Sequence, residues 1–159
     1  MRYKCVDELD KFDFKEAGVT ALRVDDDTLS IDLSSGIAKY NNPCNTKYVD
    51  CYISDTQIRM KSPKITRFFL EGPKYYDAND VLLKTVPDRD IPPEAYEETM
   101  GRLASGEVFL FREKTEGGKN DGSCEIAIDV EDDTYWLETE YEKIIIEWDR
   151  FRNRVDEGQ

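Results

Sequence analysis

Residues 124–146, CEIAIDVEDDTYWLETEYEKIII, contain the pattern that decides the fold. Apolar side chains occupy every second position from Cys124 to Val130, an acidic run follows at 131–133, and the alternation resumes from Tyr135 to Tyr141. A period of two is typical of a β-strand that buries one face and exposes the other. We therefore predict a β-hairpin that turns at the acidic run.

The chain after this hairpin fits two structures. Ile144–Ile146 has high strand propensity, which favours a second strand that turns near Glu142 and Lys143 and is followed by a frayed tail. Apolar residues between Leu137 and Val155 are also spaced by four and three, as on one face of a helix. We favour the strand, and a terminal helix is the alternative.

The same alternation recurs earlier in the chain. It predicts a hairpin from Thr20 to Leu33 with its turn at Asp25–Asp27. Further strands are expected within 47–60, 65–70 and 107–112, because these segments alternate or are rich in β-branched and aromatic residues. Strands thus account for most of the expected structure.

One helix is expected near residues 92–105. Two prolines suit its first turn and Gly106 suits its end. Tyr96, Met100 and Leu103 follow at helical spacing and would form its buried face.

These elements predict a mainly β fold. We expect an antiparallel sheet of about eight strands, curled as a sandwich or an open barrel, with the helix packed against it. A short edge strand at 81–86 and a loop at 116–122 complete the expected order. The chain shows no internal repeat or linker, so residues 1–159 are expected to form one acidic, β-rich domain.

The charge of the chain limits its partners. Lys and Arg number 22 and Asp and Glu 35, which gives a net charge of −13. A field of this sign repels nucleic-acid phosphates and anionic lipid headgroups, and it attracts cationic surfaces. The densest basic group, Arg150, Arg152 and Arg154, is followed at once by Asp156 and Glu157. We therefore expect neither a nucleic acid nor a membrane as partner.

The sequence also favours a cytoplasmic location. No apolar run approaches the ~20 residues needed to span a bilayer. The N-terminal residues turn acidic early and lack the apolar core of a signal peptide. The sequence does not indicate an oligomeric state.

Most familiar catalytic and metal sites are excluded by composition. The chain has no histidine, so it lacks the base of Ser-His-Asp and Cys-His nucleophiles and the usual ligands of catalytic zinc. No phosphate-binding glycine loop and no spaced acidic calcium loop is present in the sequence. We expect no cofactor, no metal and no enzymatic activity.

The four cysteines are irregularly placed, without the paired spacing of a zinc knuckle. In a cytoplasmic protein they are expected to be reduced. Cys51 and Cys124 lie on the apolar side of alternating strands and should be buried. A small loop disulfide between Cys44 and Cys51 is the alternative.

The candidate functional residues lie in and beside the 124–146 hairpin. Glu138, Glu140 and Glu142 share one strand face with Trp136, which predicts an acidic stripe with an aromatic anchor. A solvated face with edge-protecting charge is the alternative. The predicted partner-binding residues are Asp129, Glu131, Asp132, Asp133, Trp136, Glu138, Glu140 and Glu142.

Three stretches carry a resemblance to known proteins: DKFDFKEAGVTALRVDDDTLSIDL (10–33), FFLEGPKYYDAND (68–80) and DTYWLETEYEKIIIEWDRF (133–151). They resemble an uncharacterised family of small acidic bacterial domains, some of which are named after a subtilin biosynthesis sensor kinase. This chain has no histidine to phosphorylate and no ATP-binding signature. The opening is also similar to small toxin-immunity proteins, although residues 14–17 lack the histidine of their Phe-His-Asp-type turn.

The resemblance implies no activity or site residues. We expect a non-enzymatic binding or immunity-type protein that docks a basic protein through the acidic hairpin face. The first alternative is a β-barrel or sandwich that binds a small ligand. The second is a hydrolase that works through a pair of carboxylates.

Overall fold

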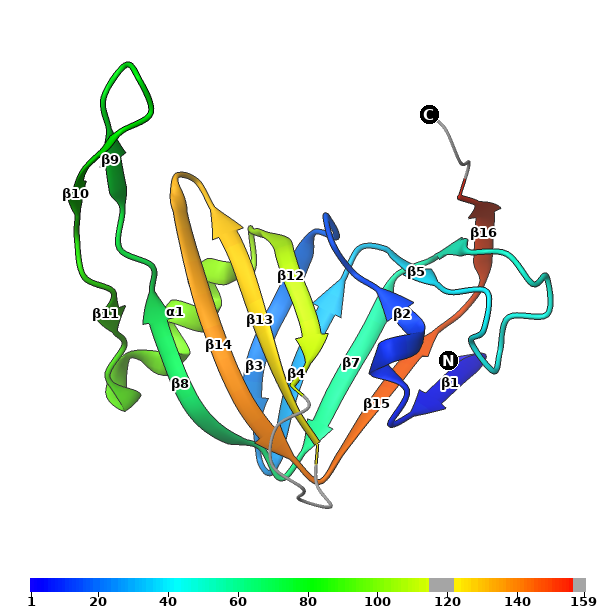
Figure 1. Ribbon diagram of the computed structural model, residues 1–159. Helices are drawn as coiled ribbons and strands as arrows, with labels where there is room; N and C mark the ends of the chain where they lie inside the picture. The colour runs from blue at the N-terminus through cyan, green and yellow to red at the C-terminus, as the bar shows by residue number, and fades with distance from the viewer. Residues whose placement is uncertain (115–121, 156–159) are drawn as a thin grey trace.

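A computed structural model describes residues 1–114 and 122–155 (Figure 1). Its strands pair in the antiparallel sense, so the predicted mainly β, antiparallel class is confirmed. The prediction of one sheet of about eight strands is wrong, because the described strands divide among sheets of 5, 5, 4 and 2 strands. These sheets do not close into a barrel within the described ranges. The loop expected at 116–122 lies outside those ranges except for Gly122.

The first five-stranded sheet contains the predicted N-terminal hairpin. In spatial order its strands are β1 (Tyr3–Val6), β15 (Lys143–Trp148), β7 (Thr56–Lys61), β4 (Thr28–Leu33) and β3 (Val19–Asp25). Strands β3 and β4 turn through Asp26 and Asp27, as the acidic run predicted. The terminal-helix alternative is wrong, because residues 143–148 pair as a strand with both β1 and β7.

The second five-stranded sheet contains the hairpin predicted within residues 124–146. Its strands, in order, are β11 (Arg89–Asp90), β8 (Lys64–Leu70), β14 (Asp133–Tyr141), β13 (Gly122–Val130) and β12 (Glu107–Glu113). Val130 pairs with Asp133, so the chain turns through Glu131 and Asp132. Ile126, Ile128 and Leu137 are buried on the inner face, as the alternation required.

Two sharp bends join these sheets. Strand β7 passes into β8 at Ser62 and Pro63, and β14 passes into β15 at Glu142. The strand pairing continues across the bends, because Lys143 pairs with Lys61 while Glu140 pairs with Lys64. The sheets are therefore two halves of the same bent pair of strands, and they diverge from the bends in Figure 1. The turn expected near Glu142 and Lys143 is present as the second bend, but the alternation does not show that it leads into another sheet.

The core lies between the two sheets. Its largest fully buried side chains include Trp148, Phe14 and Phe68. The predicted helix is present as a 3₁₀ turn, η2 (Pro93–Ala95), followed by α1 (Tyr96–Leu103). Met100 and Leu103 are buried as expected from their spacing, and Tyr96 is only partly buried against the same core.

A four-stranded sheet packs beside β1 and β15. It consists of β16 (Phe151–Arg154), β6 (Cys51–Ile53), β5 (Gly36–Ala38) and β2 (Phe12–Asp13), the last preceded by the 3₁₀ turn η1 (Leu9–Lys11). Phe12 packs edge-on against Trp148 with ring centroids 5.3 Å apart. The expectation of a frayed tail after residue 148 is wrong for residues 151–154, because they form β16 and pair with β6.

The cysteine predictions are partly confirmed. All four cysteines are free, and Cys51 and Cys124 are fully buried. The alternative of a Cys44–Cys51 disulfide is wrong. Cys44 lies instead near Cys5, with 3.8 Å between the two sulfur atoms.

Candidate functional site

The predicted docking residues lie at three different places on the β13–β14 hairpin and its ends. Asp129, Trp136, Glu138 and Glu140 lie on the outer face of the second sheet, since they alternate with the buried residues. Glu131, Asp132 and Asp133 form the turn. Glu142 is exposed at the bend, where its N–H donates to Lys61 O at 2.9 Å.

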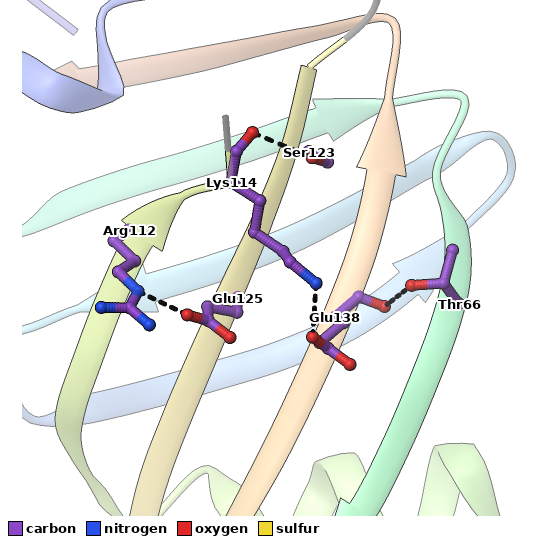
Figure 2. Close-up of polar contacts among 6 residues, drawn as sticks. All are labelled: Thr66, Arg112, Lys114, Ser123, Glu125 and Glu138. Carbon is purple, nitrogen blue, oxygen red and sulfur yellow. Dashed lines mark hydrogen bonds and ion pairs between the residues drawn. The ribbon is translucent and has the colours of Figure 1, made fainter. Parts of the chain in front are cut away.

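The outer face carries both signs of charge rather than an acidic stripe. Lys114 Nζ lies 2.6 Å from Glu138 Oε1, and Arg112 pairs with Glu125 (Figure 2). Thr66 Oγ1 donates to Glu138 O at 3.1 Å, and Ser123 Oγ donates to Lys114 O at 3.2 Å. Two central carboxylates of the face are therefore matched with cations from the β12 edge. The sequence could not show this, because the partners are 13 and 24 residues apart.

Trp136 is only half-buried, and it belongs to an aromatic layer on the same face. Its ring lies parallel to Phe69, at 6° and 6.4 Å between centroids. The Arg67 guanidinium lies 3.7 Å from the Phe69 centroid and 3.7 Å from carboxylate oxygens of both Asp88 and Asp90. Trp136 is thus partly covered by its neighbours, which lowers the area that a partner would gain from it.

The turn of the hairpin retains more unbalanced negative charge. Arg102 of α1 lies 3.2 Å from Asp133 and 3.9 Å from Glu131, and it donates to the Tyr135 hydroxyl at 2.8 Å. Asp132 is exposed, and the Glu131 side chain is 81% exposed. Arg102 therefore pairs with two of three consecutive carboxylates, and we call residues 131–133 the acidic turn.

A projecting arm next to this turn was not recognised as a site from the sequence. Residues 71–88 leave the second sheet as a ribbon that contains β9 (Lys74–Tyr76) and β10 (Leu82–Thr85), seen at the upper left of Figure 1. Leu82 pairs with Tyr76 and Thr85 with Lys74. The edge strand expected at 81–86 is present as β10, but it pairs within the arm.

The arm presents apolar side chains to solvent. Five of them are 50% to 66% exposed: Tyr75, Tyr76, Val81, Leu82 and Leu83. An isolated two-stranded ribbon is marginally stable in water, and exposed apolar side chains gathered on one projecting segment favour an interaction site. The sequence signal was the apolar content of GPKYYDANDVLLKTVP, an irregular segment bounded by Gly72-Pro73 and Val86-Pro87.

The base of the arm adjoins the acidic turn. Glu71 N donates to Thr134 O at 2.9 Å, so the arm leaves the sheet one residue from Asp133. Gly72 N donates to Asp88 Oδ1 at 2.8 Å, which joins the two ends of the arm. A Cβ at Gly72 would lie 1.8 Å from Val86 O, so only glycine allows the two chain segments to approach this closely.

The described residues contain no candidate metal-binding cluster. Within 1–114 and 122–155, no three His, Cys, Asp or Glu side chains are placed to hold a metal ion. The same ranges contain no helix that is long and apolar enough to cross a membrane.

No known family, curated protein or solved structure matches this chain.

Proposed function

We propose that this protein is a non-catalytic, immunity-type binding domain that docks a basic protein. The observation that carries the proposal is the position of the arm. The base of the arm is bonded next to the acidic turn, so the arm with its exposed apolar side chains and the negative turn leave the same end of the second sheet. The proposed partner is still a basic protein, as the sequence predicted. The proposed docking surface is centred on the arm and the acidic turn rather than on the outer face of the second sheet.

The arm supplies the affinity in this proposal. Full burial of a Leu or Val side chain contributes about 1.5–3 kcal/mol relative to leaving it in water. The arm has several such side chains at half exposure or more. Exposed ion pairs contribute only about 0.2–1 kcal/mol each, so the charges of the turn mainly accelerate and orient encounter.

The net charge supports a basic partner over a second copy of this chain. Two copies would each carry −13 and repel one another. A cationic partner is attracted, and the carboxylates at 131–133 meet it close to the arm. Glu138 contributes less than the sequence indicated, because Lys114 already neutralises it.

The test begins with capture of the partner from the native host and continues with direct titration of the purified partner. Leu83→Ser removes an arm side chain that is 66% exposed, so the fold should be unaffected. We expect Kd to rise about tenfold or more, the loss of one buried anchor. Asp132→Lys should slow association and reduce its dependence on salt.

Val24→Ser is the matched control, since Val24 is 44% exposed on β3 of the first sheet. Its affinity should equal that of the wild type. An acidic partner, or affinity that is unchanged in both Leu83→Ser and Asp132→Lys, would contradict the proposal.

A further inference from the structure

A groove along β16 gathers positive side chains from two distant parts of the chain. One pocket is lined by Tyr3, Cys44, Asn45, Thr46, Lys47, Arg150 and Phe151. The adjoining pocket is lined by Lys47, Val49, Arg152, Asn153 and Arg154. Lys47 lines both pockets, the first together with Arg150 and the second together with Arg152. The sequence shows the three arginines together but not the lysine that joins them.

These cations differ in their partners from five of the ten arginines of the protein. Arg23, Arg59, Arg67, Arg102 and Arg112 each form an ion pair with a carboxylate. Among the described residues, Lys47, Arg150 and Arg152 form no such pair. Acidic residues outnumber basic ones by 35 to 22, so cations that meet in a groove without a carboxylate partner are available for an external anion.

The loop that carries Lys47 is held in place by a buried asparagine. Asn45 Nδ2 donates to Ala38 O at 3.2 Å, to Lys39 O at 3.1 Å and to Val49 O at 2.8 Å. Asn45 Oδ1 accepts the N–H of Lys47 at 3.0 Å. Because Asn45 is 5% exposed, this network fixes the backbone of Lys47 before any ligand binds.

Among the described residues, two carboxylates close in sequence to the groove already accept hydrogen bonds from the backbone. Asp50 Oδ1 accepts the N–H of Tyr40 at 2.8 Å, and Asp149 Oδ1 accepts the N–H of Arg2 at 3.4 Å. Neither forms an ion pair with Lys47, Arg150 or Arg152 in the described chain. Lys47, Arg150 and Arg152 are exposed, so their donors are accessible from solvent.

We propose that this groove is a binding site for a phosphate-bearing small molecule. Guanidinium groups bind phosphate oxygens through two parallel hydrogen bonds, and lysine adds a point charge. The overall charge of −13 disfavours any anion at long range, so a ligand must engage several cations at once. A multiply charged phosphate does this, whereas a single carboxylate meets one cation. The pocket beside Tyr3 has a volume of about 360 Å³, which lies within the roughly 300–1,000 Å³ of small-molecule sites.

Inorganic pyrophosphate is the probe for this site. Binding is measured by calorimetry and by backbone amide NMR shifts, with ionic strength held constant by NaCl. We expect saturable binding that shifts the amides of residues 45–49 and 150–154. Lys47→Gln and Arg152→Gln should each weaken it about fivefold or more, because each removes a charge-assisted contact. The matched control is Arg23→Gln on β3, an exposed arginine outside the groove, and it should bind as the wild type does.

Three results would overturn the site. The first is no saturable binding of pyrophosphate, and the second is equal affinity in wild type, Lys47→Gln and Arg152→Gln. The third is equally tight binding of malonate at the same ionic strength, which would show attraction of anions in general rather than phosphate recognition. The site is independent of the arm, so Leu83→Ser should leave pyrophosphate binding unchanged.

Discussion

Individual side chains in this protein take their roles from neighbours on the adjacent strand. Glu138 is a clear example, because its place in an alternating acidic segment predicted free negative charge, whereas Lys114 lies 2.6 Å away. The lysine is brought there by the pairing of β12 with β13 and of β13 with β14. Local sequence gives the face on which a residue lies, and the order of strands decides which charge it meets.

The cysteines give a prediction at the same scale. Cys44 is half-buried, while Cys51 and Cys124 are fully buried. Burial, together with the neighbouring Cys44, raises the pKa of the Cys5 thiol to about 12, so almost no reactive thiolate is present at pH 8. We expect iodoacetamide to modify one thiol per native chain rapidly, and peptide mass spectrometry to locate it at Cys44.

Cys44→Ser should remove the rapid reaction, and Cys51→Ser should retain it. All four thiols should react once the protein is unfolded in urea. Rapid modification of Cys51 or Cys124 in the folded protein would show that the burial of these strands is wrong.

At the scale of elements, two hairpins were predictable because their turns are acidic and their strands alternate. Both turns begin with a residue in the left-handed region, Asp26 with φ 51° and Glu131 with φ 56°. Aspartate tolerates this region because its short side chain can bond locally, whereas glutamate has no such compensation. The β13–β14 turn therefore contains a strained residue.

Glu131→Asn should relieve this strain. Left-handed backbone costs an ordinary residue about 1–2 kcal/mol, and asparagine tolerates it better. We expect the free energy of unfolding to rise by about 0.5–1 kcal/mol. Asp132→Asn removes the same charge at the next position, where φ is not positive, and is the control. Equal effects of the two substitutions in urea denaturation would mean that charge, rather than backbone strain, is responsible.

The remaining elements show what sequence could not provide. The arm contains β-forming residues, but its strands pair with each other, so their apolar side chains stay exposed. The alternating pattern predicted one sheet, but the bends at Ser62 and Glu142 divide the strands between two sheets. The cationic groove depends on Lys47 meeting residues more than a hundred positions away. For the groove, the decisive contact is between distant segments, and a local period carries no information about it.

At the scale of the whole molecule, the bends connect the two large sheets through continuous pairs of strands. The pairs β7–β8 and β14–β15 each pass from one sheet into the other. Opening one sheet would expose the inner face of its partner, because the core lies between them. Residues of both sheets belong to one buried hydrophobic cluster, so we expect one cooperative unfolding transition.

The two tryptophans allow this cooperativity to be tested, since Trp136 lies in the second sheet and Trp148 in the first. Trp148 is fully buried against Tyr3 and Phe12, so Trp148→Phe leaves a cavity and should lower stability by about 1–3 kcal/mol. Trp136 is then the sole tryptophan. If the sheets unfold together, its fluorescence transition in urea shifts to lower concentration and coincides with the far-ultraviolet circular dichroism transition of the same variant. If Trp136 instead reports a transition at a higher urea concentration than the circular dichroism, the second sheet survives alone and the bends do not couple the two halves.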